Sequence, residues 1–440
     1  MTGFYKFLKS LGPGLLFASM AIGTSHLVLS TKAGAEYGWM MIIPILLANI
    51  LKYPFFEFGI RYTHVTQKTL VQGYLDMGKG YLWTYSVVTL VSTFTILAAL
   101  YVVTAGLLIN LFKIHISTSF AAMCLFIFIS VILIIGRYKF LENSLKLIIA
   151  VLFLALLITT GLVFMKGPVS GFENFEQPKI FDEIGVLFLI SLIGWMPTAV
   201  EASGWVSLWS IEKLKSTKQK PSLKGALNEF NLGYVLTAVL AIFFLIIGWM
   251  TFYGTGTELS SNAVTFADQV VSIFTLHIGD WAYSVIAVAA FATMFSTCMT
   301  AHDAVSRVSI DVLRKLCKTD FFKRNSSSFI KPIVSFLEKV HQDTNLFSPK
   351  TSFAIMVLLL ATINWIVLSA YSANMGNLVA LATFVSFVMA PIIGWMNHKV
   401  VTTKEIPLEY RPSGKLQFLS YIGILFLSAF AAYYCWISFF

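Results

Sequence analysis

The sequence predicts an all-α integral membrane protein with about eleven transmembrane helices. Of its 440 residues, 57% are hydrophobic and only 12% are charged, whereas soluble domains carry roughly 25% charged residues. The mean hydropathy is +0.79, and apolar runs longer than the ~20 residues needed to cross a bilayer recur along the chain. These runs are continuous and do not alternate in polarity, which excludes a transmembrane β-barrel.

We predict a single transmembrane domain over residues 1–440 with no separate soluble domain. At about 20 membrane residues plus a short loop per crossing, the length allows roughly ten to twelve helices. The predicted crossings are 14–34, 40–61, 83–112, 117–136, 146–165, 183–210, 228–252, 280–312, 351–370, 374–397 and 417–437.

The net charge of +10 would suggest a nucleic-acid partner in a soluble protein, but here its distribution follows membrane topology. Most of the 31 Lys and Arg residues fall in alternate loops, above all in 213–224 and 311–350, while 254–279 has none. Because cytoplasmic loops are enriched in positive charge, we predict a multi-pass protein of the cell membrane with a cytoplasmic N-terminus, an external C-terminus and no nucleic-acid partner.

Two predicted helices are interrupted by small, polar or helix-breaking residues. The first crossing reads AIGTSHL over residues 21–27, and the sixth reads MPTAVE over residues 196–201. A proline inside a helix removes a hydrogen bond and clashes with the preceding turn. Interrupted helices that open two five-helix halves are typical of inverted-repeat transporters, which bind substrate at the midplane between them. The alternative is a pair of plain kinks, since Pro and Gly are common in membrane helices.

The residues around these interruptions resemble a known family. GPG at 12–14 opens the first helix, AGAEYG follows at 33–38, and Asn49 and Arg61 lie in the second helix. This order resembles the natural-resistance-associated macrophage protein (NRAMP) family of divalent-metal transporters, and Met196-Pro197 fits the same register. The resemblance implies a leucine-transporter-like fold. Its 5+5 inverted repeats would span approximately 12–166 and 183–397, with an extra helix at 417–437.

The sequence departs from this family at the family's binding residues. The first-helix Asp-Pro-Gly-Asn, whose Asp and Asn are metal ligands, falls on residues 23–26, which read Gly-Thr-Ser-His. The sixth-helix Met-Pro-His-Asn falls on residues 196–199, where the Met is kept and the His is lost. The third helix reads YVVTAGL at 101–107 and has no acid where the family has an Asp and a Glu linked to proton movement. We therefore expect neither the usual manganese or iron site nor the usual proton route.

The interrupted segments supply a chemically mixed set of candidate ligands. Hydroxyls, a carboxylate and freed carbonyls suit a hard cation, imidazole and thioether suit a softer one, and helix N-termini suit an anion. If the interruptions meet, His26 and Glu201 should approach each other; alternatively, His26 packs against a carbonyl and Glu201 pairs with Lys52. The candidate substrate-binding residues are Gly23, Thr24, Ser25, His26, Met196, Thr198, Ala199 and Glu201, and the candidate metal ligands among them are His26, Met196 and Glu201.

Two further pairs are singled out by their positions. Ser296 and Thr297 in the eighth helix lie at the fold's usual position for a second cation site, next to the first interruption, although hydroxyls also serve helix packing. Glu57 and Arg61 are four residues apart and can pair on one face of the second helix. Because Arg61 lies near a helix end, we expect this pair to be a structural clasp.

The predicted function is secondary transport of a small ion. The sequence contains no P-loop, HExxH or GxSxG motif, so we predict neither an enzyme nor a primary pump, and no cofactor besides a transported or coupling ion. A small ion, such as a hydrated divalent cation, is the expected substrate, moved by alternating access. An anion or small organic substrate on the same fold is the alternative, and a channel or substrate sensor is a third reading.

Overall fold

The computed structural model describes residues 13–136, 153–169, 175–176, 178–216, 222–256, 258–280, 283–317, 349–371 and 374–439. Within these ranges the chain forms helices joined by turns and contains no strand. The helices are α2 (Pro13–Ala21), η1 (Ser25–Ser30), η2 (Ala33–Tyr37), η3 (Trp39–Met41), α3 (Ile42–Thr66), α4 (Leu70–Met77), α5 (Lys79–Phe112), α6 (Thr118–Ile135), α8 (Glu183–Trp195), α9 (Ala202–Ser216), α10 (Leu223–Phe252), α11 (Ala263–Ile278), α12 (Tyr283–Cys317), α15 (Pro349–Ala370), α16 (Met375–Val401), η5 (Leu408–Tyr410) and α17 (Gly414–Phe439).

Each predicted crossing is mostly helical where the structure describes it, apart from residues 22–23 and 196–201. Within the described residues eight helices are long and apolar enough to cross a membrane, and α2 with Ser25–Tyr37 forms a bent pair that makes a ninth span. The two remaining predicted crossings correspond to a shorter apolar helix, Phe153–Lys166, and to the broken pair α8 and α9. Residues 146–152 of the predicted fifth crossing lie outside the described residues.

Polar caps define where several helices begin. Ser117 accepts a hydrogen bond from the backbone amide of Phe120 at the start of α6, and Asp182 accepts one from Gly185 at the start of α8. These caps satisfy amides that have no partner inside the helix. Between its caps α6 is apolar on every side, and Ile127 and Phe128 point outward, as expected for a helix that contacts lipid.

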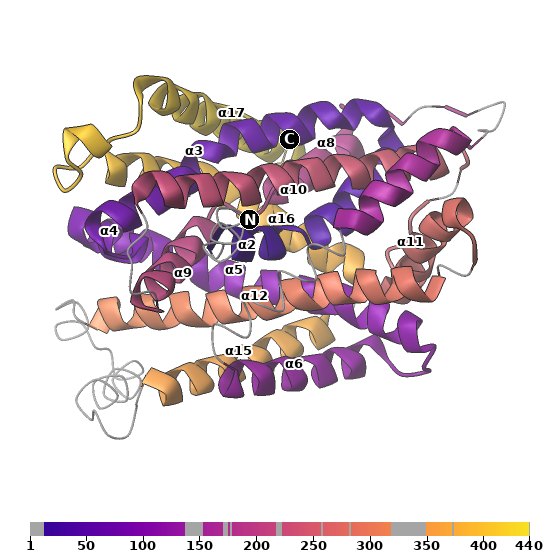
Figure 1. Ribbon diagram of the computed structural model, residues 1–440, viewed down its shortest axis with the longest axis horizontal. Helices are drawn as coiled ribbons and strands as arrows, with labels where there is room; N and C mark the ends of the chain where they lie inside the picture. The colour runs from indigo at the N-terminus through magenta and orange to yellow at the C-terminus, as the bar shows by residue number, and fades with distance from the viewer. Residues whose placement is uncertain are drawn as a thin grey trace, which may run out of the picture.

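The helices form one bundle around α2, α5 and α16 (Figure 1). Figure 1 shows α6 and α15 side by side along one edge of the bundle, with α12 between them and the centre. At the opposite edge α17 packs against α3 and α16. The broken helices α2, η1 and α9 and the second half of α8 are largely buried in the bundle, next to the long helices α3, α10 and α12.

Segments that join the helices gather at two ends of the bundle. The short helix α4, the segment 401–413 and the last turn of α12 lie at one end in Figure 1, and α11 lies at the other. The predicted loop 254–279 thus contains a helix, α11, and is remote from the basic segments. Much of 311–350 lies outside the described residues, and α4 was not predicted from the sequence. Which end faces the cytoplasm stays a prediction.

Candidate functional site

The first crossing is interrupted between Ala21 and Ser25. The two helical parts, Pro13–Ala21 and Ser25–Tyr37, are bent by 46° relative to each other. This bend frees backbone carbonyls, and Thr297 of α12 approaches them: its Oγ1 lies 2.9 Å from the Ser19 oxygen and 3.2 Å from the Ile22 oxygen. The hydroxyls of Ser19 and Ser296 are also 3.3 Å apart. The predicted second-site residues therefore lie directly against the first interruption.

The sixth crossing is interrupted between α8 and α9. The helix α8 ends at Trp195, the Met196-Pro197 peptide bond is cis, and α9 begins at Ala202. Lys52 of α3 reaches this interruption and donates hydrogen bonds to the carbonyl oxygens of Ile193 and Gly194 at 2.5 and 2.8 Å. Its Nζ also lies 3.4 Å from the Thr198 oxygen. The Ile193 oxygen also accepts the backbone amide of Met196 at 3.3 Å. An ammonium group therefore adds donors to carbonyls at the proline-containing break.

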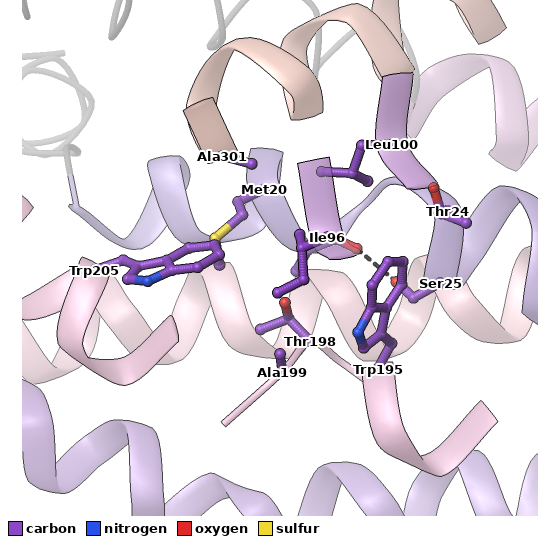
Figure 2. A pocket seen from close by; sticks show the side chains of 11 residues that line it. Met20, Thr24, Ser25, Ile96, Leu100, Trp195, Thr198, Ala199, Trp205 and Ala301 are labelled. Carbon is purple, nitrogen blue, oxygen red and sulfur yellow. Dashed lines mark hydrogen bonds between the residues drawn. The ribbon is translucent and has the colours of Figure 1, made fainter. Parts of the chain in front are cut away.

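A small cavity lies between the two interruptions (Figure 2). Its volume of about 20 Å³ is enough for roughly one water-sized guest. The indole rings of Trp195 and Trp205 form part of its wall, as Figure 2 shows. The other lining residues are Met20, Ala21, Thr24, Ser25, Ile96, Leu100, Thr198, Ala199 and Ala301.

Half of the sequence-predicted site residues line this cavity. Thr24 and Ser25 come from the first interruption, and Thr198 and Ala199 from the sixth. Gly23 instead packs against Thr297, and Met196 is fully buried but does not line the cavity. The lining thioether belongs to Met20, in the last turn of α2 before the first break. Sequence reasoning missed Met20 and Trp205 because both look like ordinary apolar helix residues, although each lies within a turn of an interruption.

The Ser25 hydroxyl links the two interruptions. Ser25 Oγ lies 2.8 Å from the Ala21 oxygen in the first crossing and 3.4 Å from the Pro197 oxygen in the sixth. It also lies 2.7 Å from Nδ1 of His26, whose Nε2 is 2.9 Å from the Thr237 oxygen of α10. Since a carbonyl oxygen only accepts, Nε2 donates to Thr237. His26 is thus held between η1 and α10 rather than in the cavity wall.

Glu201 lies behind the cavity wall. Ser386 of α16 donates to its Oε1 at 3.0 Å, and the indole nitrogen of Trp195 donates to Ser386 at 3.1 Å. The second carboxyl oxygen is buried without a hydrogen-bond partner. His26 and Glu201 bond to different helices, and no hydrogen bond or ion pair joins them in the described part of the chain. Nor does an ion pair within 4 Å join Glu201 to Lys52 there.

Side-chain hydrogen bonds and ion pairs join helices between the cavity and the end of the bundle that carries α4. Asp303, two residues beyond the lining residue Ala301, accepts from Trp209 of α9 at 3.1 Å and from Arg307 at 2.8 Å. Further out, Lys68 bonds Glu405 and Asp76, and these bonds raise its pKa. The expected clasp is also present, since Arg61 donates from Nε to both oxygens of Glu57 at 3.1 Å.

The donor set around the cavity is neutral. Its polar side chains are the hydroxyls of Thr24, Ser25 and Thr198, together with the Met20 sulfur. In the part of the chain that the structure describes, no cluster of three or more His, Cys, Asp or Glu residues is placed to hold a metal ion. A cation here would bind through hydroxyl and backbone oxygens, which suits a hard ion better than a soft one.

Comparisons with known proteins agree on fold and family. Residues 14–437 match the family model described as natural resistance-associated macrophage protein-like. An uncharacterized protein of Pasteurella multocida (strain Pm70) is 29% identical over 423 residues, which cover 96% of this chain and 90% of that protein. A mutant of the Eremococcus coleocola manganese transporter is similar in structure, with a TM-score of 0.67, 12% identity and coverage of 98% of this chain and 86% of that one. The same transporter with a bound aromatic bis-isothiourea compound gives a TM-score of 0.65 and 14% identity, over 98% of this chain and 87% of that one.

Proposed function

Since this chain belongs to the natural resistance-associated macrophage protein-like family of multi-pass membrane proteins, we propose that it is a secondary-active transporter of a small metal ion. The observation that carries the proposal is the cavity of about 20 Å³ between two interrupted helices. Interrupted helices expose backbone oxygens at the midplane, and rocking of one bundle against the other would open the site to each side in turn.

We propose a hard divalent cation as the substrate class. The similar solved structures are manganese transporters, but the cavity offers hydroxyl and carbonyl oxygens in place of the carboxylate and imidazole groups that transition metals favour. A harder ion such as Mg²⁺ keeps several waters and needs few protein ligands. The volume supports a single ion rather than an organic molecule, although the cavity must widen to admit a hydrated one.

An anion is less well supported. The side chains that line the cavity in the described residues include no Lys, Arg or His. Lys52 donates to the Ile193 carbonyl of α8, and His26 donates to the Thr237 carbonyl of α10. Neither side chain is therefore available to an anionic substrate in this conformation, and His26, Met196 and Glu201 are proposed to shape the site from behind its wall.

We propose Ser296 and Thr297 as a second ion site. The Thr297 hydroxyl has three carbonyl oxygens within 3.2 Å, those of Ser19, Ile22 and Thr293. One hydroxyl proton cannot satisfy three acceptors fully. A small monovalent cation at this point would share the carbonyls and would couple its gradient to the first interruption.

The test is uptake by purified protein in liposomes, with Mg²⁺, Mn²⁺ and other divalent ions offered with and without proton or sodium gradients. Thr24→Val and Thr198→Val keep the side-chain shape but remove a hydroxyl ligand. Each should raise KM by about 10- to 100-fold, since a lost bond to a charged group costs ~1.5–3 kcal/mol. The matched control is Thr362→Val on the outer face of α15, which should transport normally.

Two results would contradict the proposal. Unchanged affinity in both cavity variants would place the substrate elsewhere. High-affinity, proton-coupled Mn²⁺ uptake that Met196→Ala abolishes would instead establish a transition-metal site built on that thioether.

A further inference from the structure

Lys52 is a cation buried at the centre of the bundle. It lies in the middle of α3, and its side chain is fully buried. Its ammonium group contacts three backbone carbonyls, those of Ile193 at 2.5 Å, Gly194 at 2.8 Å and Thr198 at 3.4 Å. An ammonium group has three N–H donors and no acceptor. The number of acceptors therefore equals the number of donors.

The three carbonyls come from the interruption of the sixth crossing. Ile193 and Gly194 belong to the last turn of α8, whose carbonyl oxygens carry the negative end of the helix dipole. The Ile193 oxygen also accepts the backbone amide of Met196 at 3.3 Å. Thr198 belongs to the non-helical stretch between α8 and α9. Such freed carbonyls are the groups with which interrupted helices coordinate monovalent cations.

The backbone carbonyls at the two interruptions are contacted by different kinds of donor group. At the first, a neutral hydroxyl from Thr297 approaches the free carbonyls. At the sixth crossing, the ammonium group of Lys52 contacts the carbonyls. An isolated charge inside a bilayer costs at least ~2.5–3.5 kcal/mol, so a lysine is an expensive way to satisfy carbonyls that a hydroxyl would serve. The choice of an ammonium group indicates that the positive charge itself is needed.

We propose that the carbonyls of Ile193, Gly194 and Thr198 form a monovalent-cation site that the chain fills with its own Lys52 ammonium. The cation is tethered to α3, so it cannot leave with the substrate. If the proposed transport function holds, no dissociable ion is required at this interruption.

The test removes the Lys52 side chain and supplies its ammonium group as a free ion. Lys52→Ala leaves a space that matches propylammonium, and thermal unfolding of the purified full-length protein is followed with and without that ion. We expect Lys52→Ala to unfold about 5–10 °C below wild type, because three carbonyls lose the ammonium as a donor. Propylammonium should restore most of this loss with a saturable concentration dependence.

Three controls separate cation binding from general effects. Tetramethylammonium carries the charge without N–H donors and should not restore stability. Lys52→Met fills the space without charge and should stay destabilised in propylammonium. Lys404→Ala, at an exposed position, should not respond to the amine.

The outcomes are decisive in either direction. If Lys52→Ala is recovered only from cells grown with propylammonium, the proposal is supported. If the variant is not recovered even then, or if its unfolding temperature does not change with the amine, the proposal is wrong. Wild-type stability of Lys52→Met would also overturn it, because the carbonyls would then need no cation. Absence of metal uptake by wild type would contradict the transport function and leave this binding result intact.

Discussion

Gly23 determines how closely α12 approaches the first interruption. A Cβ at this position would lie 2.5 Å from Thr297 Cγ2 and 2.8 Å from its Oγ1. Real side chains do not come this close, so glycine allows the Thr297 hydroxyl to reach the carbonyls of Ser19 and Ile22. The absence of a Cβ at Gly23 therefore allows α12, in the second half of the chain, to pack closely against the first crossing.

We expect Gly23→Ala to destabilise the protein by about 1–3 kcal/mol, because the added methyl must push α12 away from the carbonyls. Thermal unfolding in detergent measures this change. The control is Gly161→Ala in the helix Phe153–Lys166, where an added Cβ meets nothing within 4 Å. Equal stability of the two variants would show that the close approach at Gly23 is not required.

At the scale of elements, α9 and α12 are joined on the α4 side of the cavity. The indole of the fully buried Trp209 donates to Asp303, and Arg307 donates to both oxygens of the same carboxylate. These bonds connect the second part of the broken sixth crossing to the helix that packs against the broken first crossing. Opening the cavity toward α4 must therefore separate α9 from α12.

We expect Trp209→Phe to weaken this closure, because it removes one charge-assisted bond of ~1.5–3 kcal/mol and keeps an aromatic ring. In a background without native cysteines, a cysteine at Thr198 should then react faster with an impermeant thiol reagent added from the α4 face. The matched control is Trp365→Phe, which loses an indole bond to Ser119 between α15 and α6. A control as fast as Trp209→Phe would argue against this clasp.

At the scale of the whole molecule, the connecting segments separate into two groups at opposite ends of the bundle (Figure 1). The basic positions around α4, 401–413 and the ends of α9 and α12 share one end, and α11 lies at the other. Because basic residues are retained on the cytoplasmic side, the α4 end is predicted to face the cytoplasm.

Cysteines introduced at Ser216 and Ser261 should therefore react from opposite sides of the membrane. In intact cells an impermeant reagent should label the cysteine at Ser261, beside α11, and should reach the one at Ser216 only after permeabilisation. Labelling of both cysteines in intact cells would refute the topology. Labelling of the cysteine at Ser216 alone would indicate the opposite orientation.

Local features of the sequence predict the fold class, the positions of the crossings and the two interruptions. These follow from local causes: continuous apolar runs need a bilayer, and Pro197 or the run of small polar residues at 21–27 cannot continue a helix. It also predicted that Thr24, Ser25, Thr198 and Ala199 lie in those interruptions, and these four residues meet at one cavity.

The groups that contact each interruption depend instead on how distant helices pack. Periodicity cannot reveal that Met20 rather than Met196 lines the cavity, because both are apolar residues near a break. Nor can it reveal that Lys52 binds the carbonyls of α8, or that His26 donates to Thr237 and not toward Glu201. These contacts join residues 141 to 211 positions apart, and a freed carbonyl takes whichever donor the packing of other helices brings to it.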